Sequence, residues 1–210
     1  MSSFVLKTIM STQLKKRVFF TFLFGLGYFF LVAALSYYLL PDGFLLQKNN
    51  ATMGWDALTN PFGEMVLILA YNSFSYIVLV LLNQYPYPYR KPFFTISFLV
   101  MFTLLTWQGI TIGTFSFTQA VYFVPDLTTR LFRNFDLLHR AALWELCGQL
   151  MFLASTARSA IAKEEDGQLS FFKAFKQFKL SKAEKLALIS AVLMVIVAAI
   201  VEGMAIFKGV

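Results

Sequence analysis

Apolar residues gather in five long stretches of the chain, separated by shorter segments rich in Gly, Pro and charged residues. Each stretch is close to the ~20 residues that an α-helix needs to cross a bilayer. Inside hydrocarbon the backbone amides must find hydrogen-bond partners within their own segment, which favours helices. The pattern predicts an all-α, polytopic integral membrane helical bundle with five transmembrane helices. They cover residues 18–40, 64–83, 93–113, 141–161 and 186–207.

Composition supports this prediction. Hydrophobic residues make up 58% of the chain and charged residues 14%, against about 25% charged residues in soluble domains. Mean hydropathy is +0.66. The apolar stretches leave no room for a soluble domain in 210 residues, so we expect one membrane domain over residues 1–210. The first stretch exceeds the ~7 to 15 apolar residues of a signal peptide and ends at Pro41, so we expect it to be retained.

Basic residues predict the orientation. With the N-terminus inside, 13 of the 18 lysines and arginines fall on the cytoplasmic side, as the positive-inside rule requires. We therefore expect a multi-pass protein of the cell (plasma) membrane, with a cytoplasmic N-terminus and the C-terminus outside. The net charge of +7 then reflects orientation and attraction to anionic membrane lipids, and we expect no nucleic-acid partner.

A cytoplasmic segment near residues 168–180 is amphipathic. At 100° per residue its phenylalanines share one narrow arc while lysines point elsewhere. These residues are Phe171, Phe175 and Phe178, with Lys173, Lys176 and Lys179. Such a segment is typical of an interfacial helix whose rings enter the headgroup layer. The alternative is that it docks on the protein's own bundle. Ser181 and Glu184 have the spacing of a capping box for the last span.

A few polar residues lie within the predicted spans at comparable depth. At 1.5 Å per residue, Gln108, Glu145 and Glu202 lie roughly 8 Å inside the outer ends of their spans. Gln149 lies one turn deeper than Glu145, and Asn72 lies near the middle of its span. The set is Asn72, Gln108, Glu145, Gln149 and Glu202. Polar groups at such depth normally face the bundle interior. We predict a shared polar layer that fastens the helices; the alternatives are an ion, proton or lipid pathway, or residues that snorkel without a common role.

Small residues in the spans indicate close helix packing. Gly109 and Gly113 form a GxxxG pair in the third span, next to the polar layer, and Gly148 lies in the fourth. The single cysteine, Cys147, excludes an intramolecular disulfide and a multi-cysteine metal site. We expect no metal and no cofactor.

Several short motifs follow one another in an order that resembles the stage II sporulation protein M family. They are Tyr71-Asn72-Ser73, Trp107-Gln108-Gly109 with Gly113, His139, Trp144-Glu145-Leu146 and Ile200-Val201-Glu202-Gly203. Gln108 stands where that family usually has Asn. The resemblance implies a multispanning membrane protein without catalytic chemistry, similar to a scaffold that holds other proteins at a membrane.

The sequence also lacks the usual motifs of hydrolases, metalloproteases and nucleotide-binding proteins, and has one histidine. We therefore expect no enzymatic activity. The function predicted is a non-enzymatic integral membrane scaffold or assembly component, with membrane lipids and other membrane or cell-envelope proteins as partners, and with homo-oligomerisation left open. The alternative is a lipid-, ion- or proton-handling transport subunit that uses the polar layer.

Overall fold

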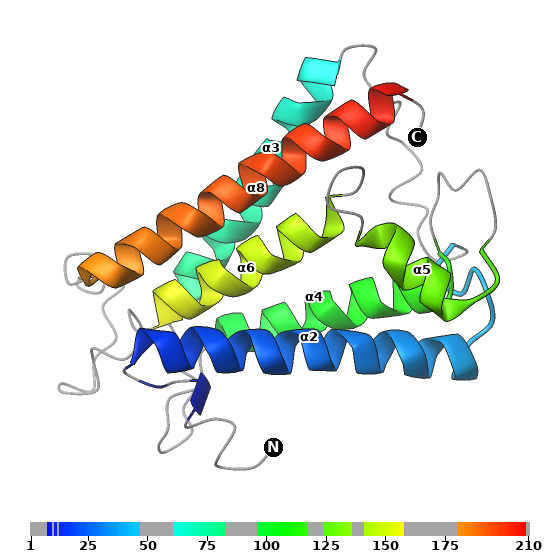
Figure 1. Cartoon of the computed structure of the whole chain (residues 1–210), viewed down its shortest axis with the longest axis horizontal. Helices are drawn as coiled ribbons and strands as arrows, with labels where there is room; N and C mark the ends of the chain where they lie inside the picture. The colour runs from blue at the N-terminus through cyan, green and yellow to red at the C-terminus, as the bar shows by residue number, and fades with distance from the viewer. Residues whose placement is uncertain are drawn as a thin grey trace.

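The computed structural model describes residues 8–9, 11, 13–46, 61–82, 96–116, 124–135, 141–157 and 180–208. These residues form six helices of eight or more residues, and no strand is found among them (Figure 1). The helices are α2 (Leu14–Leu39), α3 (Pro61–Leu82), α4 (Ile96–Gly113), α5 (Leu127–Asn134), α6 (Ala142–Thr156) and α8 (Lys182–Lys208).

Helix α6 is the centre of the bundle. It packs against α2 on one side and α8 on the other, while α4 packs on α2 and α3 packs on α8 (Figure 1). One core cluster includes Phe29, Leu105 and Leu150 from α2, α4 and α6. A second includes Leu79, Phe152 and Val195 from α3, α6 and α8. Because α6 contributes to both cores, it holds the two helix pairs together.

Consecutive long helices alternate in direction. Gly109 lies against Phe29 and Val32, and Gly113 against Ala33 and Ser36, so α2 and α4 run the same way. Arg17 meets Ala154 while Gly25 meets Leu150, so α6 is antiparallel to α2. Helices α2, α4 and α8 run in one direction and α3 and α6 in the other (Figure 1). We name the two ends of the bundle by the buried arginines that lie there, the Arg17 end and the Arg130 end.

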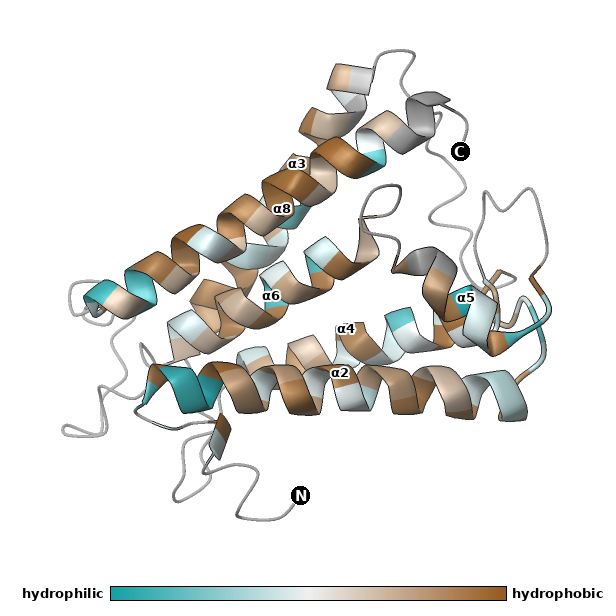
Figure 2. Ribbon diagram, in the orientation of Figure 1, coloured by the Kyte–Doolittle hydropathy of each residue, from teal (hydrophilic) through white to brown (hydrophobic). Residues whose placement is uncertain are grey.

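Three helices are long and apolar enough to cross a membrane: Leu14–Leu39, Met65–Leu82 and Lys182–Met204. Their apolar residues run along most of their length, and hydrophilic positions gather in the first turns of α2 and α8 (Figure 2). The other two predicted spans correspond to α4, with 18 residues, and α6, with 15. The count of five membrane crossings therefore stays a prediction.

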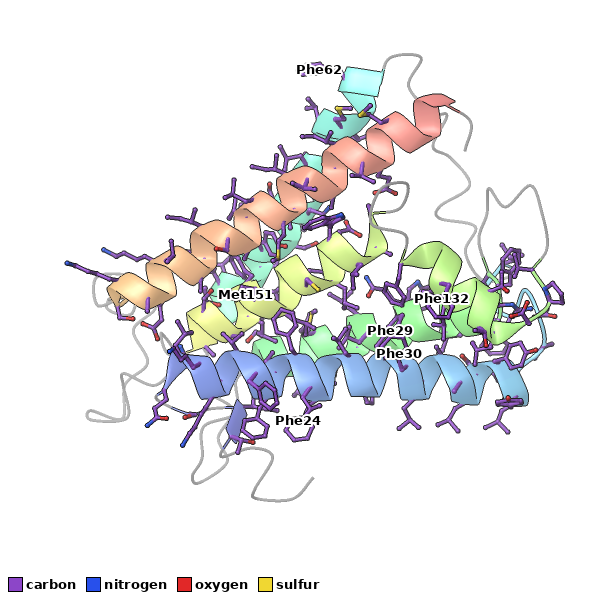
Figure 3. The ribbon with its side chains drawn as sticks, in the orientation of Figure 1. Phe24, Phe29, Phe30, Phe62, Phe132 and Met151 are labelled. Carbon is purple, nitrogen blue, oxygen red and sulfur yellow. The ribbon has the colours of Figure 1, made fainter. Side chains whose placement is uncertain are left out.

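Large apolar side chains are exposed on the outer helices. Phe19, Leu31, Phe74, Ile77 and Leu193 each expose more than half of their surface, while α6 has an almost fully buried C-terminal half. Figure 3 shows Phe62 at the first turn of α3 and Phe24 on the far side of α2 from α6. Exposed apolar surface of this extent indicates faces that meet something other than water.

The first helix ends where the sequence predicts. Helix α2 ends at Leu39, two residues before Pro41, which has no amide hydrogen to continue the helix. Gly43 supplies the positive φ of the turn that follows. The turn is fixed to the end of α4, because the Gly43 amide donates to the Thr114 carbonyl at 2.7 Å.

Both glycines of the GxxxG pair lie against α2. A Cβ at Gly109 would come within 2.8 Å of Val32 Cγ1, and a Cβ at Gly113 would collide with Ser36 Oγ and the Ala33 carbonyl oxygen. The pair therefore sets the close approach of α2 and α4. The nearest atoms to both glycines belong to α2, and their position next to the polar layer stays a prediction.

We expect Gly113→Ala to reduce the free energy of unfolding by ~1 to 3 kcal/mol, because the backbone carbonyl of Ala33 cannot move aside as a flexible side chain can. Gly27→Ala is the matched control: it lies on the same helix pair, nothing lies within 4 Å of its Cβ position, and alanine favours a helix by ~1 kcal/mol. Denaturant titration in detergent micelles measures both. Equal effects of the two substitutions would contradict this account of the α2–α4 contact.

Candidate functional site

A fully buried arginine joins three helices at the Arg17 end. Arg17 lies in the first turn of α2, and its Nη2 donates to Glu184 Oε1 on α8 at 2.6 Å. Its Nε donates to the Ala154 carbonyl near the end of α6 at 2.5 Å, and its Nη1 to the Ser11 carbonyl at 2.8 Å. The Ala154 carbonyl lies in the last turn of α6 and has no hydrogen-bond partner within that helix, so the guanidinium supplies one. The C-terminal end of a helix also favours a positive charge.

Glu184 is held in place by its own helix. Its Oε2 accepts from the Ser181 amide at 2.9 Å, and its amide donates to Ser181 Oγ at 3.3 Å. This is the capping box predicted from the sequence. One carboxylate therefore caps α8 with one oxygen and pairs with Arg17 through the other. We call Arg17 with Glu184 the inner clamp.

A second buried arginine joins the opposite end. Arg130 of α5 donates from Nε to the Val124 carbonyl at 2.6 Å and from Nη1 to the carbonyl of Gly113, the last residue of α4. Its Nη2 is 2.8 Å from Asp42 Oδ1, just after α2. Its guanidinium carbon lies 5.1 Å from the ring centre of Tyr37. We call Arg130 with these partners the outer clamp.

Phe115 holds a strained backbone beside the outer clamp. Its φ is +51°, a region that bulky side chains rarely adopt. The Ser116 amide bonds the Thr111 carbonyl at 2.8 Å and the Phe115 amide bonds the Ile112 carbonyl at 3.2 Å, which is the Schellman motif, usually completed by Gly. The ring of Phe115 lies 5.3 Å from the Arg130 guanidinium. The cation–π contact offers a physical reason for a phenylalanine there.

Helix α5 is positioned by its cap and by aromatic rings. Asp126 Oδ1 accepts from the Thr129 amide at 2.7 Å, and this bond holds the pKa of the Asp126 carboxyl below its usual range. The Phe135 ring, just after α5, lies 5.6 Å from both Phe29 and Phe30 of α2. Figure 3 shows Phe29 and Phe30 close to α5, with Phe132 on the α5 ribbon.

The predicted polar layer is partly assembled between α3 and α6. Asn72 Nδ2 donates to Glu145 Oε1 at 2.5 Å. Farther along both helices, one turn beyond Asn72 on α3 and two turns beyond Glu145 on α6, the Tyr76 ring stacks on Phe152 with ring centres 4.2 Å apart. Among the described residues, no hydrogen-bond partner is found for the buried Tyr76 OH and Gln149 Oε1. The Tyr76 hydroxyl lies 3.2 Å from the position that a Cβ would take at Gly148, so that glycine makes room for it.

The other members of the predicted layer lie elsewhere. Gln108 is half-buried on α4, whose main neighbour is α2. Helices α6 and α8 are antiparallel, and Gly148 of α6 faces Ala191 and Val195 of α8. Counted along the helix axes from that contact, Glu202 lies at least about one turn, ~5 Å, beyond Glu145. A layer that includes Gln108 and Glu202 remains a prediction. The interfacial helix near 168–180, with its Phe and Lys residues, lies outside the described residues.

We expect the Asn72–Glu145 bond to show as a coupling energy. Asn72→Leu and Glu145→Met should each reduce the free energy of unfolding by ~1 to 3 kcal/mol, because each leaves a partly buried partner unsatisfied, and the double variant should lose less than the sum. Denaturant titration in detergent micelles measures the cycle. A cycle of Gln108→Leu with Glu145→Met is the control, expected to be additive. Additivity in both cycles would contradict the bond.

Sequence reasoning missed both clamps. In the sequence, Arg17 and Arg130 are only two of the 18 basic residues that predict the orientation. The one available signal was the Ser181-to-Glu184 spacing, which placed a carboxylate at a helix start but gave no indication of its arginine partner. Within the described residues, no three His, Cys, Asp or Glu side chains are grouped as a metal site would require.

Comparison of the chain with protein-family models, with curated proteins and with solved structures finds no match.

Proposed function

We propose that this chain is a non-enzymatic integral membrane scaffold or assembly component that organises partner proteins at the membrane, in a role similar to that of the stage II sporulation protein M family. The observation that carries the proposal is how its buried polar groups are used. Arg17, Glu184 and Arg130 bond elements distant in the chain, which suits a rigid frame more than a reactive centre.

The exposed apolar faces of α2, α3 and α8 support the same proposal, because they fit contact with lipid or with other membrane helices. The proposal includes five membrane crossings in the cell membrane, with the Arg17 end in the cytoplasm. The alternation of helix directions suits five successive crossings. Under this topology α5, with Phe132 76% exposed, is available to partners on the outer side.

Cross-linking tests the scaffold role. A photoreactive residue at Phe132 should capture a membrane or cell-envelope protein in intact cells, and deletion of the chain should displace that same protein from its membrane location. A photoreactive residue at Phe98, which is buried in the core, is the matched control and should capture nothing. Failure to find a protein that meets both conditions would contradict the proposal.

The second candidate is a transport subunit. It is favoured by one observation: the buried Gln149 Oε1 and Tyr76 hydroxyl near Glu145 find no hydrogen-bond partner within the described part of the chain. Unsatisfied buried polar groups are candidates for binding an ion or proton. The purified chain in liposomes, tested for ion or proton flux against its Glu145→Gln variant, measures this. Flux abolished by the substitution would favour transport over the scaffold role.

A further inference from the structure

An apolar groove of about 360 Å³ lies between α3, α6 and α8. That volume is within the range of ~300 to 1,000 Å³ typical of ligand sites. One face of α3 lines it from Leu69 to Leu81, and Val192 and Val195 line it from α8. Phe152 of α6 completes the lining. The groove is therefore built from the three helices that form the second core.

The groove has the length of one lipid chain. From Leu69 to Leu81, α3 rises ~18 Å at 1.5 Å per residue. Half of a ~30 Å hydrocarbon core is ~15 Å, the depth of one leaflet. A fully extended acyl chain from a single leaflet therefore matches the groove along its whole length.

The groove is open to the side of the bundle. Its wall includes the stacked pair Tyr76 and Phe152, which belong to the core. Its rim residues remain accessible, with Ile77 58% and Val192 41% exposed. Both rim residues lie on helices that are long and apolar enough to cross a membrane. A lipid chain could enter sideways from the membrane without any movement of the bundle.

Positive charge lies at one end of the groove. Lys185 is exposed and precedes Val192 by seven residues, so the two side chains share one face of α8, ~10 Å apart along its axis. Lys182, also exposed, lies nearly one turn farther. The acidic neighbour Glu184 is buried and paired with Arg17, so it does not cancel the charge of these lysines.

We propose that this groove binds one anionic phospholipid, with an acyl chain between α3 and α8 and the phosphate at Lys185 and Lys182. The proposal goes beyond the scaffold role and does not depend on it. The lipid headgroup and the acyl chain are recognised by different residues, so the two contacts can be tested separately.

Binding of the acyl chain is tested by filling the groove with a larger side chain. The full-length protein is reconstituted in nanodiscs of equal parts phosphatidylglycerol and phosphatidylcholine, released into mild detergent, and its retained lipids are counted by native mass spectrometry. We expect one retained phosphatidylglycerol per chain, reduced about tenfold by Val192→Trp. Leu193→Trp is the matched control, since Leu193 is exposed beside Val192 but does not line the groove, and it should retain the lipid.

Ser73→Phe fills the same groove from α3 and decides the result if Val192→Trp fails to fold. Retention by both groove-filling variants at the level of Leu193→Trp would overturn the proposal, because the retained lipid would then bind elsewhere on the protein.

Binding of the lipid headgroup is tested by reversing the charge of the two lysines. Lys182→Glu with Lys185→Glu should abolish the preference for phosphatidylglycerol over phosphatidylcholine, a change of about thirtyfold for two lysines near a phosphate. Lys15→Glu with Lys16→Glu is the control, because both lysines are exposed in the first turn of α2 and do not line the groove. An unchanged preference in the α8 variant, or an equal loss in the α2 variant, would overturn the assignment of the phosphate to Lys185.

Discussion

Replacing Arg17 with Met should lower the apparent melting temperature in detergent by about 10 °C, because breaking a buried ion pair typically costs ~3 to 5 kcal/mol. The substitution leaves Glu184 buried beside an apolar side chain and removes the donor to the Ala154 carbonyl. Helices α2, α6 and α8 lose their common contact at this end. Thermal unfolding followed by circular dichroism measures the effect.

Two variants separate this effect from a general loss of charge. Lys16→Met removes a neighbouring exposed lysine and should change stability by less than ~0.5 kcal/mol. Glu184→Gln keeps a side chain that can complete the capping box but leaves Arg17 without its counter-charge. Combined with Arg17→Met, it should cost less than the sum of the two single changes. If Arg17→Met behaves like Lys16→Met, the inner clamp does not stabilise the bundle.

Replacing Arg130 with Met should have an effect of similar size at the opposite end. The Val124 and Gly113 carbonyls lose a charged donor, and each such hydrogen bond contributes ~1.5 to 3 kcal/mol. The contacts of the guanidinium with Tyr37 and Phe115 are lost at the same time. We expect the apparent melting temperature to fall by about 10 °C, with α5 the first helix to lose protection in hydrogen exchange.

The matched comparison is Asp42→Asn. Asp42 is 53% exposed, and exposed ion pairs contribute at most ~1 kcal/mol, so this variant should remain near the wild type. Arg130→Lys keeps the charge but cannot reproduce the planar fork that reaches both carbonyls; we expect it to recover only part of the lost stability. Equal effects of Asp42→Asn and Arg130→Met would show that the ion pair, and not the carbonyl contacts, holds this end.

The two clamps share one physical design. Each arginine joins a carbonyl near the C-terminal end of one helix to a carboxylate that belongs to another segment. A helix C-terminus has carbonyls without intrahelical partners and a partial negative charge. A guanidinium can satisfy such a carbonyl and a carboxylate together because its donors point in several directions. Each arginine thereby fixes the relative position of helices that the chain places far apart.

The sequence by itself determined the features that depend on local interactions. A helix in an apolar environment satisfies its hydrogen bonds within its own segment, so hydropathy was enough to place α2, α3 and α8. Helix ends were readable for the same reason: Pro41 cannot continue α2, and Ser181 and Glu184 are three residues apart in one turn. The tight α2–α4 contact was signalled by Gly109 and Gly113, although their partner helix was not.

Only the tertiary structure decided which polar groups meet. Depth along a span is set by sequence, but the direction in which a side chain faces its neighbours depends on how helices rotate and cross, and many arrangements share one hydropathy pattern. Glu145 therefore pairs with Asn72 while Gln108 lies on another helix pair. Arg17 and Glu184 stand 167 positions apart, and charge pairing between such distant residues follows only from packing. The groove beside Val192 arises in the same way, from three helices that do not fill the space between them.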